Sequence, residues 1–131
     1  MKTHFAERPA FREPTGEERA LLDRLMQGDF PGRDELARLL VNIFVRNIDA
    51  DGGLELQTQV QGRAPVTKRI PIEAEARDED GIAIHALLHV IEGKPVELEL
   101  FREDGRNVKR LPDPSEFELV VLPPMPGEEP S

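Results

Sequence analysis

The chain has 131 residues, no cysteine, tryptophan or tyrosine, and a formal net charge of −9 from 17 basic and 26 acidic side chains. This length suits one domain, and the missing cysteines exclude disulfides, thiolate zinc sites and a cysteine nucleophile. No run reaches the roughly 18 consecutive apolar residues of a membrane span, and residues 1–11 lack the apolar stretch of a signal peptide. We therefore expect a soluble cytoplasmic protein.

The N-terminal part predicts an arm followed by a helix. Residues 1–14 show no hydrophobic periodicity and contain two prolines, which is typical of an irregular arm. Thr15 and Glu18 have the spacing of a capping box, in which each side chain accepts a hydrogen bond from the other residue's backbone amide. Apolar residues at helical spacing follow, and Gly28 is a typical stop signal, so a first helix is predicted at 16–27.

A second helix and a β-hairpin are expected next. Pro31 favours a helix start, and an apolar stripe at helical spacing follows it until the pattern changes near Val41. From there the residues are β-branched and aromatic, and they lead to the turn cluster 49–53 and a second strand at 54–58. The short acidic sequences at 49–52 and 78–81 are interpreted as turns, because neither is followed by the glutamate that completes a calcium loop.

The rest of the chain predicts a β-meander. Strands are expected at 70–76, 82–91 and 96–103, with a last strand at 116–122 and a proline-rich flexible tail at 123–131. The predicted fold is thus a single α+β domain over 15–122, with two N-terminal helices followed by a mostly antiparallel sheet of five to six strands.

Alternation fixes which residues of the meander share a face. Even-numbered positions are apolar on all three strands, so they are predicted to lie on one buried face: Ile70, Ile72, Ala74, Ala76, Ile82, Ile84, Ala86, Leu88, Val90, Val96, Leu98 and Leu100. Three-residue loops ending in glycine would pair even positions with even ones. In that register Glu75 and Glu99 both lie opposite His85, while Glu73 and Glu97 lie opposite Leu87.

The odd-numbered face therefore carries the candidate site. Its candidate ligand-binding residues are Glu73, Glu75, His85, Glu97, Glu99 and Phe101, and the candidate metal ligands are Glu75, His85 and Glu99. A plain solvated sheet face would show the same alternation. Because Leu87, Ile91 and Phe101 are apolar, a helix, the tail or another subunit covering this face is a further alternative. His89 is expected to be a partly buried, hydrogen-bonded residue rather than a ligand.

Part of this pattern resembles a family of small uncharacterised bacterial proteins that is classed as a domain of unknown function. The resemblance covers about residues 12–122, and it implies a fold of helices followed by a meander, with no reaction, cofactor or catalytic residue. It rests on Glu18, Leu21-Leu22, Val45-Arg46, Asp49, Gly52, Ile70-Pro71-Ile72-Glu73-Ala74, Asp80-Gly81, Leu87-Leu88-His89-Val90, Gly93 and Glu97-Leu98-Glu99.

Two hypotheses about function follow from the charge. Residues 1–48 hold eight basic and eight acidic side chains, so the whole acidic excess lies in 49–131. Such a surface repels phosphates, which argues against nucleic acid and anionic membranes as partners. The first hypothesis is a non-enzymatic interaction or regulatory module that binds a protein partner or itself as a homodimer. The alternative is a small-ligand or divalent-metal-binding protein that uses the acidic and histidine-bearing face. A catalytic alternative, in which Glu75 or Glu99 raises the pKa of His85 for general acid or base chemistry, is left open. No residue is assigned a catalytic role, and no cofactor is predicted.

Overall fold

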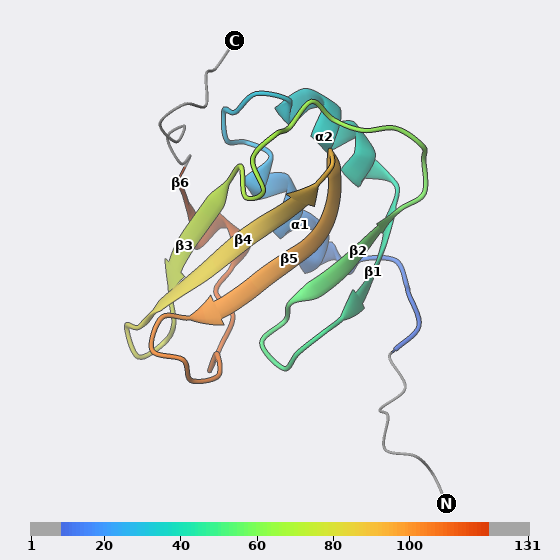
Figure 1. Cartoon of the computed structure of the whole chain (residues 1–131). Helices are drawn as coiled ribbons and strands as arrows, with labels where there is room; N and C mark the ends of the chain where they lie inside the picture. The colour runs from blue at the N-terminus through green and yellow to red at the C-terminus, as the bar shows by residue number, and fades with distance from the viewer. Residues whose placement is uncertain (1–8, 121–131) are drawn as a thin grey trace, which may run out of the picture.

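The computed structural model describes residues 9–120, and it shows one open sheet with two helices packed on one of its faces (Figure 1). The predicted α+β class, with two helices followed by an antiparallel sheet, is confirmed. The expected tail 123–131 and the first eight residues of the expected arm lie outside the described residues. No helix within 9–120 is long and apolar enough to cross a membrane.

Both helices form where the sequence places them. Helix α1 covers Gly16–Leu25 and begins with the predicted capping box: the Thr15 hydroxyl accepts a hydrogen bond from the Glu18 amide, and the Glu18 carboxylate accepts one from the Thr15 amide. Helix α2 covers Arg33–Val41. Each helix turns its apolar stripe to the sheet, with Leu21, Leu22 and Leu25 from α1 and Leu36, Leu39 and Leu40 from α2 buried.

The sheet has six antiparallel strands in the order β1-β2-β5-β4-β3-β6. The long connection after β2 places that strand beside β5, so the strands do not follow chain order. A 3₁₀ turn, η1, at Pro114–Glu116 leads into the short edge strand β6, and the buried Phe117 between them packs into the core. The strand bounds are β1 Ile43–Asn47, β2 Leu54–Thr58, β3 Glu73–Arg77, β4 Ala83–Ile91, β5 Lys94–Arg102 and β6 Glu118–Val120.

The pairing of β3 with β4 has the predicted register, and the pairing of β4 with β5 does not. Glu75 lies opposite His85, as expected. On its other side His85 lies opposite Phe101 rather than Glu99, and Glu99 pairs with Leu87. The predicted register of the second hairpin is therefore wrong by two residues.

The turn and a β-bulge explain this shift. The turn has two residues, Glu92 and Gly93, with φ of 51° and 78°, where a three-residue loop was expected. A two-residue turn pairs even positions with odd ones, and Val90 accordingly lies opposite Pro95. The register then shifts by one between His89 and Val90, and this bulge restores the pairing of even with even positions along the rest of the hairpin.

The bulge also changes which side chains reach the core. Pro95 is buried, whereas Val96, predicted to be buried, is only half-buried, as are Ile70 and Ile82 near strand ends. The other even-numbered positions of the meander are buried as predicted: Ile72, Ala74, Ala76, Ile84, Ala86, Leu88, Val90, Leu98 and Leu100.

Candidate functional site

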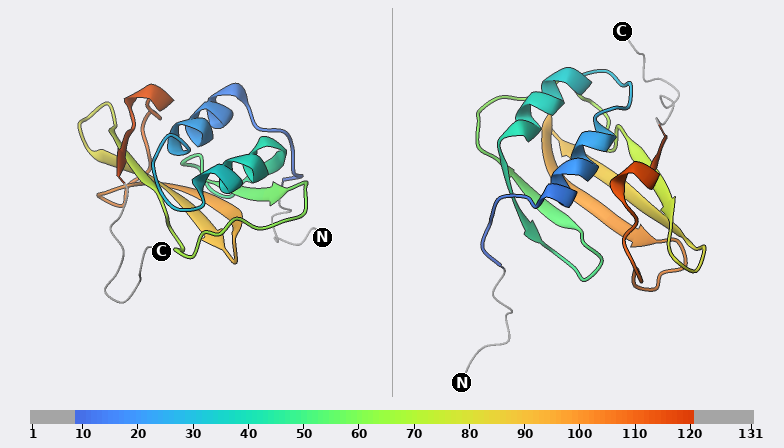
Figure 2. Two further views of the ribbon diagram at one scale, coloured as in Figure 1. Left: turned by 90° about the horizontal axis from the view of Figure 1, so that it is seen from above. Right: turned by 180° about the vertical axis from the view of Figure 1, so that it is seen from behind.

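The candidate site lies on the sheet face that the helices leave uncovered. In Figure 2, α1 and α2 lie together on one side of the sheet, and within residues 9–120 no helix lies on the other side, here called the open face. Its acidic side chains, placed by strand register and contacts, are Glu55, Glu73, Glu75, Glu97, Glu99, Glu103 and Glu118; its basic ones are Arg46, Arg69, Arg77 and Lys94. Carboxylates outnumber cations on this surface.

His85 stands between two carboxylates in the middle of the open face. Its Nδ1 is 2.9 Å from Glu73 Oε2 and its Nε2 is 3.0 Å from Glu103 Oε1, while the Phe101 ring stacks on the imidazole at 5.1 Å. Partial burial opposes protonation, but the hydrogen bonds to Glu103 and Glu73 outweigh it and raise the His85 pKa. Only an imidazolium can donate through both nitrogens at once. With both ring nitrogens facing carboxylates, His85 offers no free lone pair to a metal.

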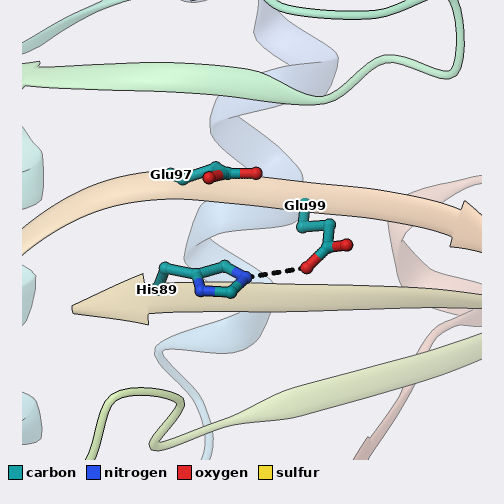
Figure 3. A group of neighbouring side chains, drawn as sticks. All are labelled: His89, Glu97 and Glu99. Carbon is teal, nitrogen blue, oxygen red and sulfur yellow. Dashed lines mark hydrogen bonds and ion pairs between the residues drawn. The ribbon is translucent and has the colours of Figure 1, made fainter.

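His89 forms a second group with two glutamates of β5 (Figure 3). Arg69 Nε donates to His89 Nδ1 at 3.2 Å, which leaves the proton on Nε2, and Nε2 donates to Glu99 Oε1 at 2.7 Å. Glu97 lies directly opposite His89 on the paired strand, and one ligand atom of each of the three residues lies within 4.8 Å of the others. A metal ion at Nε2 would have to displace this proton and the Arg69 contact.

The predicted metal ligands Glu75, His85 and Glu99 are not brought together as a set. Glu75 lies opposite His85, but its carboxylate is 3.7 Å from Arg77, and Glu99 bonds to His89 instead. The register shift of two residues causes this exchange, because it moves Glu99 one row along β4 and brings Phe101 opposite His85. Glu73 and Phe101, two of the predicted ligand-binding residues, do contact His85.

A buried ion network at the end of β5 was not predicted from the sequence. Arg102 is 3% exposed and contacts Asp78 at 2.9 Å, Asp80 at 3.0 Å and Asp104 at 2.6 Å. Asp78 also accepts hydrogen bonds from the backbone amides of Lys109, Arg110 and Glu79, so it ties the segment after β5 to the turn before β4. The signal in the sequence was an arginine at an even-numbered, otherwise apolar position, between the turn that carries Asp78 and Asp80 and the turn that carries Asp104.

The hydrogen bonds in this network decide its protonation. Burial raises the pKa of Asp78, but the bonds from Lys109, Arg102, Glu79 and Arg110 outweigh burial and keep it well below its usual range. The Arg102 hydrogen bond comes first among the causes that lower the pKa of Asp104 to about 2. Arg102 in turn has a raised pKa, through its bonds to Asp104 and Asp78. The network is therefore fully ionised at neutral pH, and its role is to hold the fold.

A hollow of about 260 Å³ lies on the open face beside His89. Three aliphatic side chains, two carboxylates and one guanidinium line it: Ile48, Ile91, Val96, Glu55, Glu97 and Arg69. We call this group the acidic hollow. Larger hollows, of about 590, 430 and 280 Å³, are lined by α1 and by residues of 110–116, away from the histidines.

Comparison with known protein families gives a match to this chain. A family model described as Domain of unknown function (DUF6984) matches residues 11–112, which include both helices and strands β1 to β5. No curated protein and no solved structure shows a significant match. The resemblance predicted from the sequence, to a domain of unknown function, is thereby confirmed at that level.

Proposed function

We propose a binding function for this chain, which belongs to the DUF6984 family of domains of unknown function: its open face binds a basic segment of a protein partner, without catalysis. The observation that carries the proposal is the excess of carboxylates on a sheet face that no helix within 9–120 covers. Surfaces of one sign steer partners of the other sign and favour them over like-charged ones. In this proposal the chain is a cytoplasmic interaction or regulatory module.

The burial of the charged side chains supports this proposal. The Glu73 side chain is 22% exposed and bonds to His85, and the Glu99 side chain is 39% exposed and bonds to His89. Each of the two histidine side chains is 13% exposed. Such carboxylates are fixed before a partner arrives, so less side-chain entropy is lost on binding. Leu87 lies opposite both glutamates, and Phe101 lies in the next row opposite His85; both are half-buried and offer apolar area next to the charges.

Salt should control this interaction. We expect a short peptide of alternating lysine and glycine to shift the backbone amide signals of β3, β4 and β5 in a ¹⁵N-labelled sample. The dissociation constant should rise on the order of tenfold between about 50 and about 300 mM NaCl, because screening weakens attraction between exposed charges. The matched peptide of alternating glutamate and glycine should cause no shift. Shifts confined to the helices, or equal effects of both peptides, would contradict the proposal.

A homodimer through the same face is the competing outcome. Two acidic faces repel each other, so we expect size-exclusion chromatography coupled to light scattering to give the mass of a monomer at low salt. A dimer that strengthens with salt, and that the lysine peptide does not dissociate, would replace the basic partner by a second copy of this chain.

Divalent-metal binding is a second candidate function, favoured by the three ligand atoms of His89, Glu97 and Glu99 that lie within 4.8 Å of one another. If it is correct, saturating Mn²⁺ or Zn²⁺ should raise Tm by about 5 °C, because a ligand of the folded state alone stabilises it. His89→Ala should abolish the rise, and the control His85→Ala should keep it. An unchanged Tm in the wild-type protein would exclude this candidate.

A further inference from the structure

We infer that the acidic hollow takes the side chain of one lysine or arginine of the partner, with its aliphatic stem against the apolar wall and its charged end at Glu97. This inference rests on the proposed function and makes it specific. A basic side chain has this two-part chemistry, since its methylene stem favours apolar contact while its head seeks an anion. The hollow, at about 260 Å³, is smaller than the usual range for drug-sized ligands.

The lining of the hollow is divided in the way that such a side chain requires. Ile48 and Ile91 are 46% and 43% exposed, so they present aliphatic surface to the solvent. Val96 joins them because the bulge in the β4–β5 hairpin turns it away from the core position that alternation assigns to it. Bulges commonly re-aim one side chain in this manner.

Glu97 supplies the charge at the polar side of the hollow. Among residues 9–120 no hydrogen bond or ion pair reaches its carboxylate, whereas the neighbouring Glu99 bonds to His89. Glu55 lies directly opposite Glu97 on β2, so two carboxylates face each other across the strand pair. Like charges placed opposite each other on a sheet are unfavourable. Arg46 already bonds to Glu55, and a cation at Glu97 would compensate the second carboxylate.

The basic side chains near the hollow are held by other partners. Arg46 Nε donates to Glu55 at 2.8 Å, and its guanidinium lies 4.2 Å from the centre of the Phe11 ring. Arg69 Nε donates to His89 Nδ1. These contacts direct both guanidinium groups to fixed positions and leave the Glu97 carboxylate as the acceptor for an incoming cation.

The test compares two carboxylates of the same face. Glu97→Gln removes the charge at the hollow, and Glu118→Gln removes an exposed charge on β6, opposite Glu75 and away from the hollow. The affinity of each variant for two basic peptides is measured by fluorescence anisotropy at low salt. One peptide alternates arginine with glycine, and the other alternates lysine with glycine. A third peptide, with citrulline in place of arginine, keeps the shape and lacks the charge.

We expect Glu97→Gln to weaken binding of the basic peptide about fivefold, the upper range for a partly exposed ion pair, and Glu118→Gln by less than about twofold. The citrulline peptide should bind both variants and the wild type equally weakly. Comparing the affinities of the arginine peptide and the lysine peptide shows which of the two side chains the hollow prefers. Ile91→Ser, which shortens the apolar wall without changing the charge, should weaken both basic peptides.

The outcomes separate this inference from the function on which it rests. Equal losses for Glu97→Gln and Glu118→Gln would overturn the specific subsite while leaving the acidic face as a diffuse binding surface. Basic peptides that bind no better than the citrulline peptide would overturn the proposed function itself. Folding of each variant is checked by its Tm, and substitutions at surface positions of this kind usually change stability little.

Discussion

Replacing Arg102 with methionine is expected to lower Tm by more than about 10 °C, the largest effect of any single change proposed for this protein. Arg102 is 3% exposed, and its guanidinium forms ion pairs with three aspartates, one of which, Asp78, has a fully buried side chain. Removing one partner of a buried ion pair leaves the other charge uncompensated in a medium that solvates it poorly. Thermal unfolding followed by circular dichroism measures the loss.

Matched variants distinguish the network from a general effect of removing an arginine. Arg77→Met makes the same chemical change at a side chain that is 69% exposed, and it should leave Tm nearly unchanged. The double variant Arg102→Met with Asp78→Asn should recover part of the loss, because it removes the unpaired charge together with its partner. A Tm for Arg102→Met equal to that of Arg77→Met would show that the network contributes nothing to stability.

Acid should protonate the aspartates and break the ion pairs of the same network between about pH 4 and about pH 2. The folded-state pKa of Asp104 is lowered to about 2, and that of Asp78 lies below its usual range. In an unfolded chain the pKa of an aspartate is about 3.9. Groups with a depressed folded-state pKa stabilise the fold above the unfolded value. That contribution is lost as the pH falls through the folded value. The urea midpoint of unfolding should therefore drop steeply in this window.

A variant makes the acid prediction specific to the network, since every carboxylate of an acidic protein titrates in that range. Asp104→Asn should be less stable than the wild type above about pH 5, and the difference should shrink towards zero as the pH falls to about 2. The difference in urea midpoint is measured across the whole pH range. A constant difference down to the lowest pH would mean that Asp104 does not stabilise the fold through its charge.

The network stabilises the fold, whereas the open face is proposed to bind a partner. The variants Arg102→Met and Glu97→Gln test these two roles separately. Arg102 lies at the end of β5 and holds Asp78, which accepts hydrogen bonds from the segment that leads to η1 and β6. Glu97 lies on the opposite face of the same strand, next to the bulge. A loss of peptide binding in Glu97→Gln with an unchanged Tm therefore reports on the surface alone, whereas Arg102→Met reports on the fold.

The amino-acid sequence alone determined the elements and the faces. The capping box at Thr15 and Glu18 located the first helix, and the alternation of apolar residues divided the meander into a buried and an open face. Both signals are local: a cap is decided by residues three apart, and a strand exposes alternate side chains to opposite sides whatever its neighbours are. These features therefore survived where the predicted pairing was wrong, except at the bulge, where Val96 left the predicted buried face.

Only the tertiary structure decided which side chains of the open face meet. A shift of two residues between neighbouring strands keeps every side chain on its own face, so a pattern of period two gives no information about it. The two-residue turn at Glu92 and Gly93 and the bulge after it set that shift, and they moved Glu99 from His85 to His89. The burial of Arg102 also depends on tertiary contacts. Two of its aspartate partners, Asp78 and Asp80, come from a turn more than twenty residues earlier, and only Asp104 is close in sequence.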